Sequence, residues 1–130
     1  MRSTIGMKVR AYEKTDLEEI NSWYNKRKLP LVNAEIMPKT GFIVPGVAVA
    51  FMYKTDSEIA LLDGCISNPD AAPYERKEAL EIIMNELVCE AAHQGFNKVI
   101  AMTRHPSIKE VCKRANLRDI GEYTMFSKEL

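Results

Sequence analysis

Acid–base chemistry is the reaction type for which this sequence offers the clearest candidates. His105 follows an apolar run, and an imidazole can act as a general base near neutral pH. Asp63 interrupts another apolar run, and Glu35 and Glu58 are further carboxylates that become effective bases when they are buried. Each candidate also has a structural interpretation: His105 as a surface or capping residue at a helix start, and Asp63 as an outward-facing residue or part of a β-bulge with Gly64.

A β–α–β unit in the middle of the chain is expected to position these residues. Apolar runs at Ile59–Ser67 and 98–103 predict two strands, and a helical pattern covers 74–94 after a turn at 68–73. Two strands joined by one long helix are expected to be parallel, with a right-handed crossover. The N-terminus of the helix then faces the end of the first strand, where it forms a ready anion site.

The rest of the chain predicts a single domain over 8–130, with the order β-α-β-β-β-α-β-α-β. Residues 1–7 are expected to be a loose N-terminal tail, and 31–39, bracketed by Pro30 and Pro38, a loop or short helix beside a cleft. The further expected elements are a strand at 8–12, a helix at 16–28, a hairpin of Gly41–Val44 with 47–53, a helix at 108–115, and a closing strand or hairpin from 118–121 and 123–127.

Composition excludes several classes of function. Lys+Arg and Asp+Glu both number 18, which argues against a general nucleic-acid binder. No apolar run approaches the roughly 20 residues that span a bilayer, and the first residues lack a signal-peptide core, so we expect no membrane association. Three isolated cysteines without metal-ligand spacing indicate a reducing, cytoplasmic setting and no metal site.

The element order resembles that of the GNAT (Gcn5-related N-acetyltransferase) superfamily. This resemblance implies an α/β (α+β) fold, in which a mixed central sheet has an antiparallel meander, a β-α-β crossover and flanking helices. The stretch from Phe42 to Pro69 is also similar to small GNAT-like proteins of phages and prophages, which implies the host cytoplasm as the setting. The local features that carry the resemblance are Val9-Arg10 before Asp16-Leu17, Ala91-Ala92-His93-Gln94-Gly95-Phe96 before Lys98-Val99-Ile100, and Asn116-Leu117 where the family commonly has Gly-Phe.

The resemblance implies acetyl-CoA as the cofactor, although the phosphate-binding signature is altered. The family pattern Arg/Gln-x-x-Gly-x-Gly/Ala falls on Glu75–Leu80, where Glu78 and Leu80 replace both glycines. Glycines matter in such a cradle because backbone N–H groups must approach the phosphates. The positions that the resemblance assigns to the cofactor are Ile66, Ser67, Asn68, Arg76, Lys77, Glu78, Ala79 and Leu80.

Two alternatives remain open for these positions. Arg76 and Lys77 could bind phosphates through their side chains, or they could form a solvated helical turn in which Lys77 pairs with Glu81. The segment from Ile66 to Asn68 could hold the acyl and pantetheine portion through strand backbone, or it could simply end the strand with turn-forming residues.

The family's general acid, a tyrosine on the last helix, corresponds here to Cys112. A thiol can protonate the departing CoA thiolate, but Cys112 also fits an apolar stripe with Ile108, Val111 and Ala115 and is then a core residue. Two functions follow as hypotheses. One is acetyl transfer from acetyl-CoA to an unknown amine on a small molecule or protein. The alternative is a catalytically inactive GNAT-fold binding or structural protein, and a homodimer is compatible with either.

Overall fold

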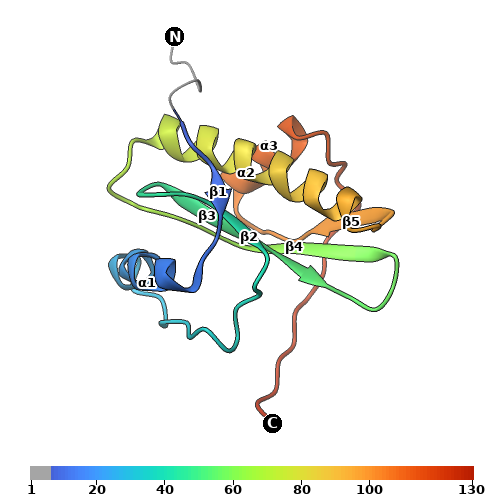
Figure 1. Cartoon of the computed structure of the whole chain (residues 1–130), viewed down its shortest axis with the longest axis horizontal. Helices are drawn as coiled ribbons and strands as arrows, with labels where there is room; N and C mark the ends of the chain where they lie inside the picture. Colours follow the sequence, from blue (N-terminus) through green and yellow to red (C-terminus); the bar gives the residue numbers. More distant parts are fainter. Residues whose placement is uncertain (1–6) are drawn as a thin grey trace.

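The computed structural model describes residues 7–130 and contains one five-stranded mixed sheet with helices on both faces (Figure 1). The strands lie side by side in chain order, β1-β2-β3-β4-β5. The first four are joined antiparallel, whereas β4 and β5 run parallel. The strands are β1 (Arg10–Ala11), β2 (Gly41–Val44), β3 (Ala48–Lys54), β4 (Ile59–Ser67) and β5 (Lys98–Ala101).

Helix α2 (Pro73–His93) is the predicted crossover between β4 and β5, and it packs on the upper face of the sheet beside α3 (Pro106–Arg114). Pro73 suits the first helical position because it lacks an N–H and its φ is preset. Gly95, at φ +92, follows the helix in a conformation that favours glycine. Helix α1 (Leu17–Lys26) covers part of the opposite face (Figure 1).

Two apolar clusters hold the layers together, and strand alternation decides which residues join each one. The upper cluster lies between the sheet and α2, where the predicted helix stripe of Leu80, Ile83, Met84, Leu87 and Ala91 is buried. The lower cluster lies between the sheet and α1, and Trp23, Ile43 and Phe51 are fully buried in it. These contacts confirm the predicted mixed α+β fold. Among residues 7–130, no helix is both long and apolar enough to cross a bilayer.

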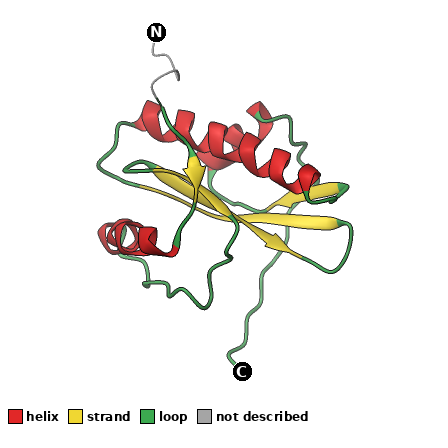
Figure 2. Cartoon of the chain, in the orientation of Figure 1, coloured by secondary structure: helices red, strands yellow, loops and turns green. Residues whose placement is uncertain are grey.

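The prediction of a closing strand or hairpin at 118–121 and 123–127 is wrong. After α3, Asn116 adopts a left-handed φ of +65, and the Leu117 amide donates to the Cys112 carbonyl, which ends the helix. Residues 118–130 then continue as an extended segment without strand pairing, drawn as loop in Figure 2. The physical reason is that a strand needs a hydrogen-bonded neighbour, and this segment leaves the sheet without meeting one.

Two other expectations concern the chain outside regular elements. The segment 31–39 is a loop with a turn, not a helix. The predicted loose tail falls largely on residues 1–6, which lie outside the described part of the chain, whereas Met7 packs against the upper cluster.

Candidate functional site

A notch in the sheet opens where β4 and β5 part. Their parallel pairing ends at Leu62 and Ala101, and the Met102 amide makes a last, 3.3 Å hydrogen bond to the Leu62 carbonyl. Strand β4 continues to Ser67, and over this last part β3 is its only strand neighbour among residues 7–130. One backbone edge of residues 63–67 is therefore unpaired toward β5. We call this edge the β4 notch. Apart from the Ser67 carbonyl, which accepts a hydrogen bond from Arg27, its N–H and C=O groups that face β5 are available to an extended ligand.

A β-bulge shapes the notch. Ile66 and Asp63 pair with β3 residues that are two positions apart, so Gly64 and Cys65 together oppose the single residue Ala50. Gly64 sits at φ +74, a conformation that side-chain-bearing residues rarely adopt. The bulge predicted at Gly64 is therefore confirmed, although its second residue is Cys65, because Asp63 pairs with Phe51. The extra residue turns Cys65 toward the upper cluster while Ile66 packs in the lower one.

Asp63 lies beside two half-buried phenols. Burial raises the pKa of Tyr53, and the Asp63 charge raises it further. The pKa of Tyr24 is raised by burial first, then by Tyr53 and Asp63. Tyr53 also lines an open depression of about 410 Å³ beside the 36–40 segment. A carboxylate and two phenols are therefore close to one another on the face that α1 only partly covers, and one of the phenols, Tyr53, also lines the open depression.

Two thiols lie on the other side of the bulge. Burial, followed by the neighbouring Cys112, raises the pKa of Cys65 to about 12. Burial also raises the pKa of Cys112. Both thiols are free of disulfides, and both pack against the upper cluster. Cys112 thus fits its core interpretation, and it also carries its proton at neutral pH, which is the state a proton donor requires.

A pair of arginines lies at the open end of β4. Arg27, at the end of α1, donates from Nε to the Ser67 carbonyl and from Nη2 to the Ser67 hydroxyl, both at 2.9 Å. Arg76, in the first turns of α2, donates to the Pro69 carbonyl at 3.4 Å. The pKa of Arg27 is lowered by burial first and by Arg76 second, so the two cations are close to one another.

Neither guanidinium of this Arg27–Arg76 pair has a carboxylate partner among residues 7–130. Two adjacent, unneutralised guanidiniums at a helix N-terminus favour an anion, phosphate above all. Sequence reasoning found Arg76 but missed Arg27. No local signal marks Arg27, because it reaches Ser67 across 40 positions of sequence.

The other predicted cofactor positions on α2 already make contacts within the protein. Lys77 Nζ lies 2.7 Å from Glu110 Oε2 on α3, so its charge is paired, though not with the expected Glu81. The Arg76 amide donates to Ala72, which places the amides of Glu78, Ala79 and Leu80 inside the helical ladder. Ala79 and Leu80 side chains are buried in the upper cluster.

Glu78 differs from its neighbours because its Oε2 is buried and has no hydrogen-bond partner in the described part of the chain. A carboxylate therefore occupies a position that the family pattern gives to glycine.

The remaining candidates have structural partners. Asn68 holds the turn after β4: its amide group donates to Gly46, and its Oδ1 accepts from the Asp70 amide. His105 is exposed at the start of α3, with Nδ1 2.8 Å from the Ser107 hydroxyl. Residues 7–130 contain no group of three or more His, Cys, Asp or Glu side chains that could hold a metal ion.

Comparison with known proteins decides which fold this is. No protein-family profile and no curated protein sequence matches the chain. Solved structures do match. A protein of Agrobacterium tumefaciens assigned to the acetyltransferases has a TM-score of 0.69 at 12% identity, covering 94% of this chain and 100% of its own. A protein of Thermus thermophilus has a TM-score of 0.68 at 17% identity, covering 95% and 98%. The fold is that of the GNAT acetyltransferases.

Another structure with this GNAT fold includes a ligand. It is an aminoglycoside N-acetyltransferase, AAC(6')-Iy, in complex with CoA, which has a TM-score of 0.65 at 14% identity and covers 95% of this chain and 100% of its own. At these identities the comparison concerns the GNAT fold, and the chemistry of this chain must be argued from its own residues.

Proposed function

We propose that this protein is an acyl-CoA-dependent N-acyltransferase that transfers an acetyl group from acetyl-CoA to an amine. The observation that carries the proposal is the β4 notch. It offers unpaired strand backbone to a pantetheine arm, and it opens at one end onto the Arg27–Arg76 pair, where the phosphates would lie. Backbone recognition depends little on side-chain identity, so it persists although the glycines of the family pattern are replaced.

In the proposed reaction, a residue on one side of the bulge accepts a proton and a residue on the other side donates one. The amine nitrogen attacks the thioester carbonyl, the new C–N bond forms, and the C–S bond breaks. Asp63, beside Tyr24 and Tyr53, accepts the proton that the amine loses. Cys112, which keeps its proton at neutral pH, supplies a proton to the departing thiolate and regains one from solvent. Because both reactants are held together in the notch, the activation barrier is lowered by proximity.

One observation favours the alternative of a GNAT-fold binding or structural protein without catalysis. The buried carboxylate oxygen of Glu78, which has no hydrogen-bond partner among residues 7–130, lies in the turns of α2 that follow the proposed anion site. An uncompensated carboxylate there opposes the binding of a pyrophosphate. The two functions are separated by whether acetyl-CoA binds.

Calorimetric titration with acetyl-CoA tests the proposal. We expect saturable binding, and we expect Arg27→Ala and Arg76→Ala each to weaken it by about 10-fold or more, because a hydrogen bond to a charged group contributes about 1.5–3 kcal/mol. Lys77→Ala is the matched control. It should change binding little, because Lys77 is paired with Glu110.

A second ligand and a stability measurement complete the test. Acetyl-pantetheine, which lacks the phosphates close to the arginines, should bind the wild type and both arginine variants equally. Thermal unfolding of each variant separates a lost ligand contact from a lost structural one, which matters for Arg27 because it also holds Ser67. No binding at millimolar acetyl-CoA would overturn the proposal in favour of the alternative.

A further inference from the structure

The open depression beside Tyr53 lies close to the proposed general base, Asp63. Asp63 pairs with Phe51, and Tyr53 is two positions further along β3. Residues two apart on a strand share a face, so Asp63 and Tyr53 are diagonal neighbours on the underside, with roughly 7–8 Å between them. The opposite wall of the depression is the 36–40 segment, which leads into β2, and β2 and β4 flank β3 on opposite sides. Tyr53 therefore lies between the carboxylate of Asp63 and the depression.

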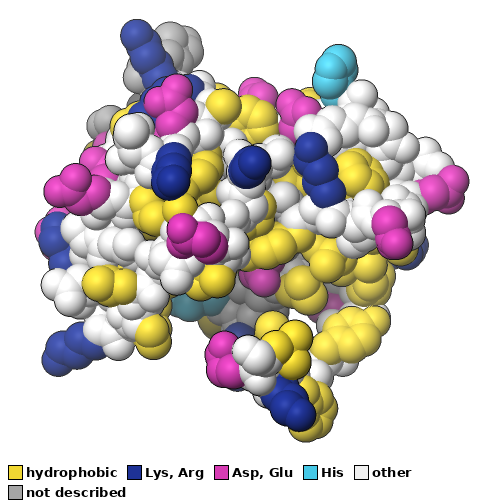
Figure 3. Space-filling model, turned by 60° about the horizontal axis from the view of Figure 1, so that its bottom comes forward, with side chains coloured by type: hydrophobic (Ala, Val, Ile, Leu, Met, Phe, Trp, Pro, Cys, Tyr) yellow, Lys and Arg dark blue, Asp and Glu magenta, His cyan; other side chains and the backbone are white. Residues whose placement is uncertain are grey.

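The lining of this depression is largely apolar. Ile36, Met37, Pro38 and Met52 line it together with Tyr53, and Ile36 is 60% exposed. Figure 3 shows the underside, where hydrophobic side chains are visible with Lys and Arg side chains among them. Concave, mostly apolar surfaces with a few polar groups are typical of sites for small molecules and short peptides. The part of a ligand that crosses Tyr53 into the depression is thus expected to be apolar.

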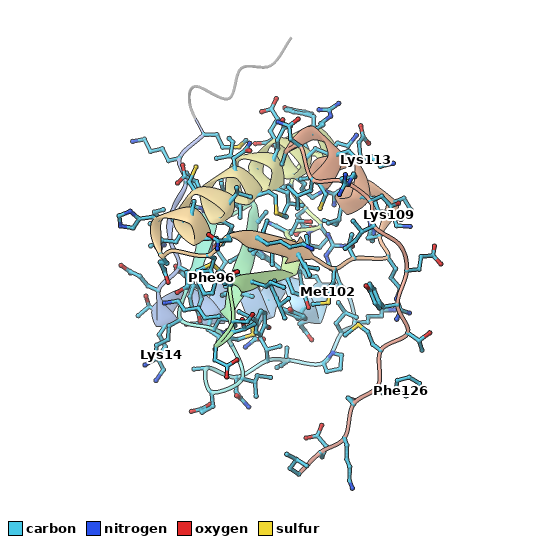
Figure 4. The ribbon with its side chains drawn as sticks, turned by 90° about the vertical axis from the view of Figure 1, so that its right-hand side faces the viewer. Lys14, Phe96, Met102, Lys109, Lys113 and Phe126 are labelled. Atoms are coloured by element: carbon cyan, nitrogen blue, oxygen red, sulfur yellow. The ribbon has the colours of Figure 1, made fainter. Side chains whose placement is uncertain are left out.

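Lysines carry the charge at the depression. Lys39 and Lys54 line it, and none of the described residues that line it is a carboxylate. A second depression of about 440 Å³ shares Lys39 and is lined also by Lys14 and by one carboxylate, Glu35. Figure 4 shows Lys14 on the underside of the molecule. Three lysines thus border the two depressions, against one glutamate.

The charges of Lys39 and Lys54 are not neutralised by the protein. Neither lysine forms an ion pair with a carboxylate among residues 7–130. A surface lined by cations raises the local concentration of anions and repels other cations. The underside therefore presents a carboxylate at Asp63 and positive charge across Tyr53, and these two ends favour a ligand with the opposite charges, an ammonium group and an anion.

We propose that the amine bound on this face carries a carboxylate at its far end, joined through an apolar spacer. The amine lies at Asp63, the spacer crosses Tyr53, and the carboxylate is held by Lys39 and Lys54, which set the specificity. Neighbouring strands lie about 4.8 Å apart, so the path from β4 across β3 to the 36–40 segment is about 10 Å, the length of three extended peptide residues. That this ligand is the acetyl acceptor rests on the proposed function, whereas its recognition does not require acetyl-CoA.

Titration of the full chain with trileucine, followed by the NMR shifts of backbone amides, tests the recognition. We expect saturable shifts at Lys39, Tyr53 and Lys54. Trileucine amide, which lacks only the negative charge, should bind about 5-fold more weakly, because two solvent-exposed ion pairs are lost. Acetylated trileucine, which lacks the ammonium group, should also bind more weakly. An ω-aminoalkanoate of the same length shows whether the spacer is peptide or alkyl chain, and tighter binding of either one supports the proposal.

Lysine variants assign the preference for the carboxylate. Lys39→Gln with Lys54→Gln should bind trileucine and trileucine amide equally. Lys109→Gln is the matched control, because Lys109 is an exposed lysine on α3, on the opposite face of the sheet, and it should keep the preference. Equal binding of the two peptides by the wild type, or a preference that survives in the double variant, would overturn the proposal.

Acetyl transfer to the same peptides separates this inference from the proposed function. With acetyl-CoA present, mass spectrometry should show acetylated trileucine forming faster than the acetylated amide, and the Lys39→Gln, Lys54→Gln variant should lose this difference. Selective binding of trileucine without any acetylation would overturn the proposed function and leave the recognition of the amine and carboxylate supported. Acetylation of both peptides at equal rates would support the proposed function and overturn the inference about specificity.

Discussion

The bulge at Gly64 gives the sharpest test of how the notch is built. Replacing Gly64 by alanine adds one methyl group at a residue with φ +74. An ideal Cβ there would lie 3.0 Å from Cδ2 of Phe51, closer than ordinary contact. Phe51 has little room to move, because it is fully buried and makes an edge-to-face contact with Tyr12 at 4.8 Å between ring centroids. The substitution therefore combines backbone strain with steric crowding.

The two costs can be separated with a second glycine. The left-handed backbone conformation costs a non-glycine residue roughly 1–2 kcal/mol. Crowding in a packed core typically adds about 1–3 kcal/mol. Gly64→Ala is thus expected to lower the free energy of unfolding by about 2–5 kcal/mol. Gly46→Ala is the control, since Gly46 has φ +77 and its added Cβ would meet nothing within 4 Å. It should show the backbone cost alone.

Urea unfolding followed by the fluorescence of Trp23, the one tryptophan in the sequence, measures both variants. Trp23 is buried in the lower cluster together with Phe51, so it reports on the layer that is perturbed. A further variant, Phe51→Leu, should reduce the penalty of Gly64→Ala when the two are combined. If Gly64→Ala costs no more than Gly46→Ala, or if its cost is the same with Leu at position 51, the steric reasoning is refuted.

Three further predictions concern individual ionisable groups. Asp16→Asn should destabilise the fold at neutral pH, because the Arg10 hydrogen bond holds the pKa of Asp16 below its usual range. This stabilisation is lost as the pH falls through the folded-state pKa, so the difference in free energy of unfolding between wild type and variant should narrow on acidification. A difference that does not depend on pH would contradict the prediction. Iodoacetamide at mildly alkaline pH should label the exposed Cys89 and spare Cys65, because burial raises the pKa of Cys65 to about 12. Peptide mass spectrometry measures the labelling, and equal labelling of both cysteines would contradict the prediction. Asp63→Asn should lower kcat by about 100-fold or more with acetyl-CoA affinity unchanged, as expected for a lost general base, and an unchanged kcat would remove Asp63 from the mechanism.

The sequence by itself determined the elements and their order. Apolar periodicity located β2 and β4 at the bounds that the structure shows, and it located α2 to within one residue at each end. These segments carry strong local signals, because alternation and a 3.6-residue stripe follow directly from which face is buried. The bulge at Gly64, next to Asp63, could also be predicted from the sequence, because a polar residue followed by glycine interrupts an apolar strand there.

Only the tertiary structure decided which residues meet at the site. Arg27 joins Arg76 at the end of β4 because α1 packs beneath the sheet, and no local pattern encodes that contact. Lys77 pairs with Glu110 on another helix in preference to its neighbour one turn away.

The predicted closing strand also shows that a local sequence pattern does not determine long-range pairing. Residues 123–127 have a strand's pattern, but a strand needs a hydrogen-bonded neighbour, and this segment runs away from the sheet and pairs with none of the described strands. Local sequence fixes what a segment can become, whereas long-range packing decides which neighbours it finds.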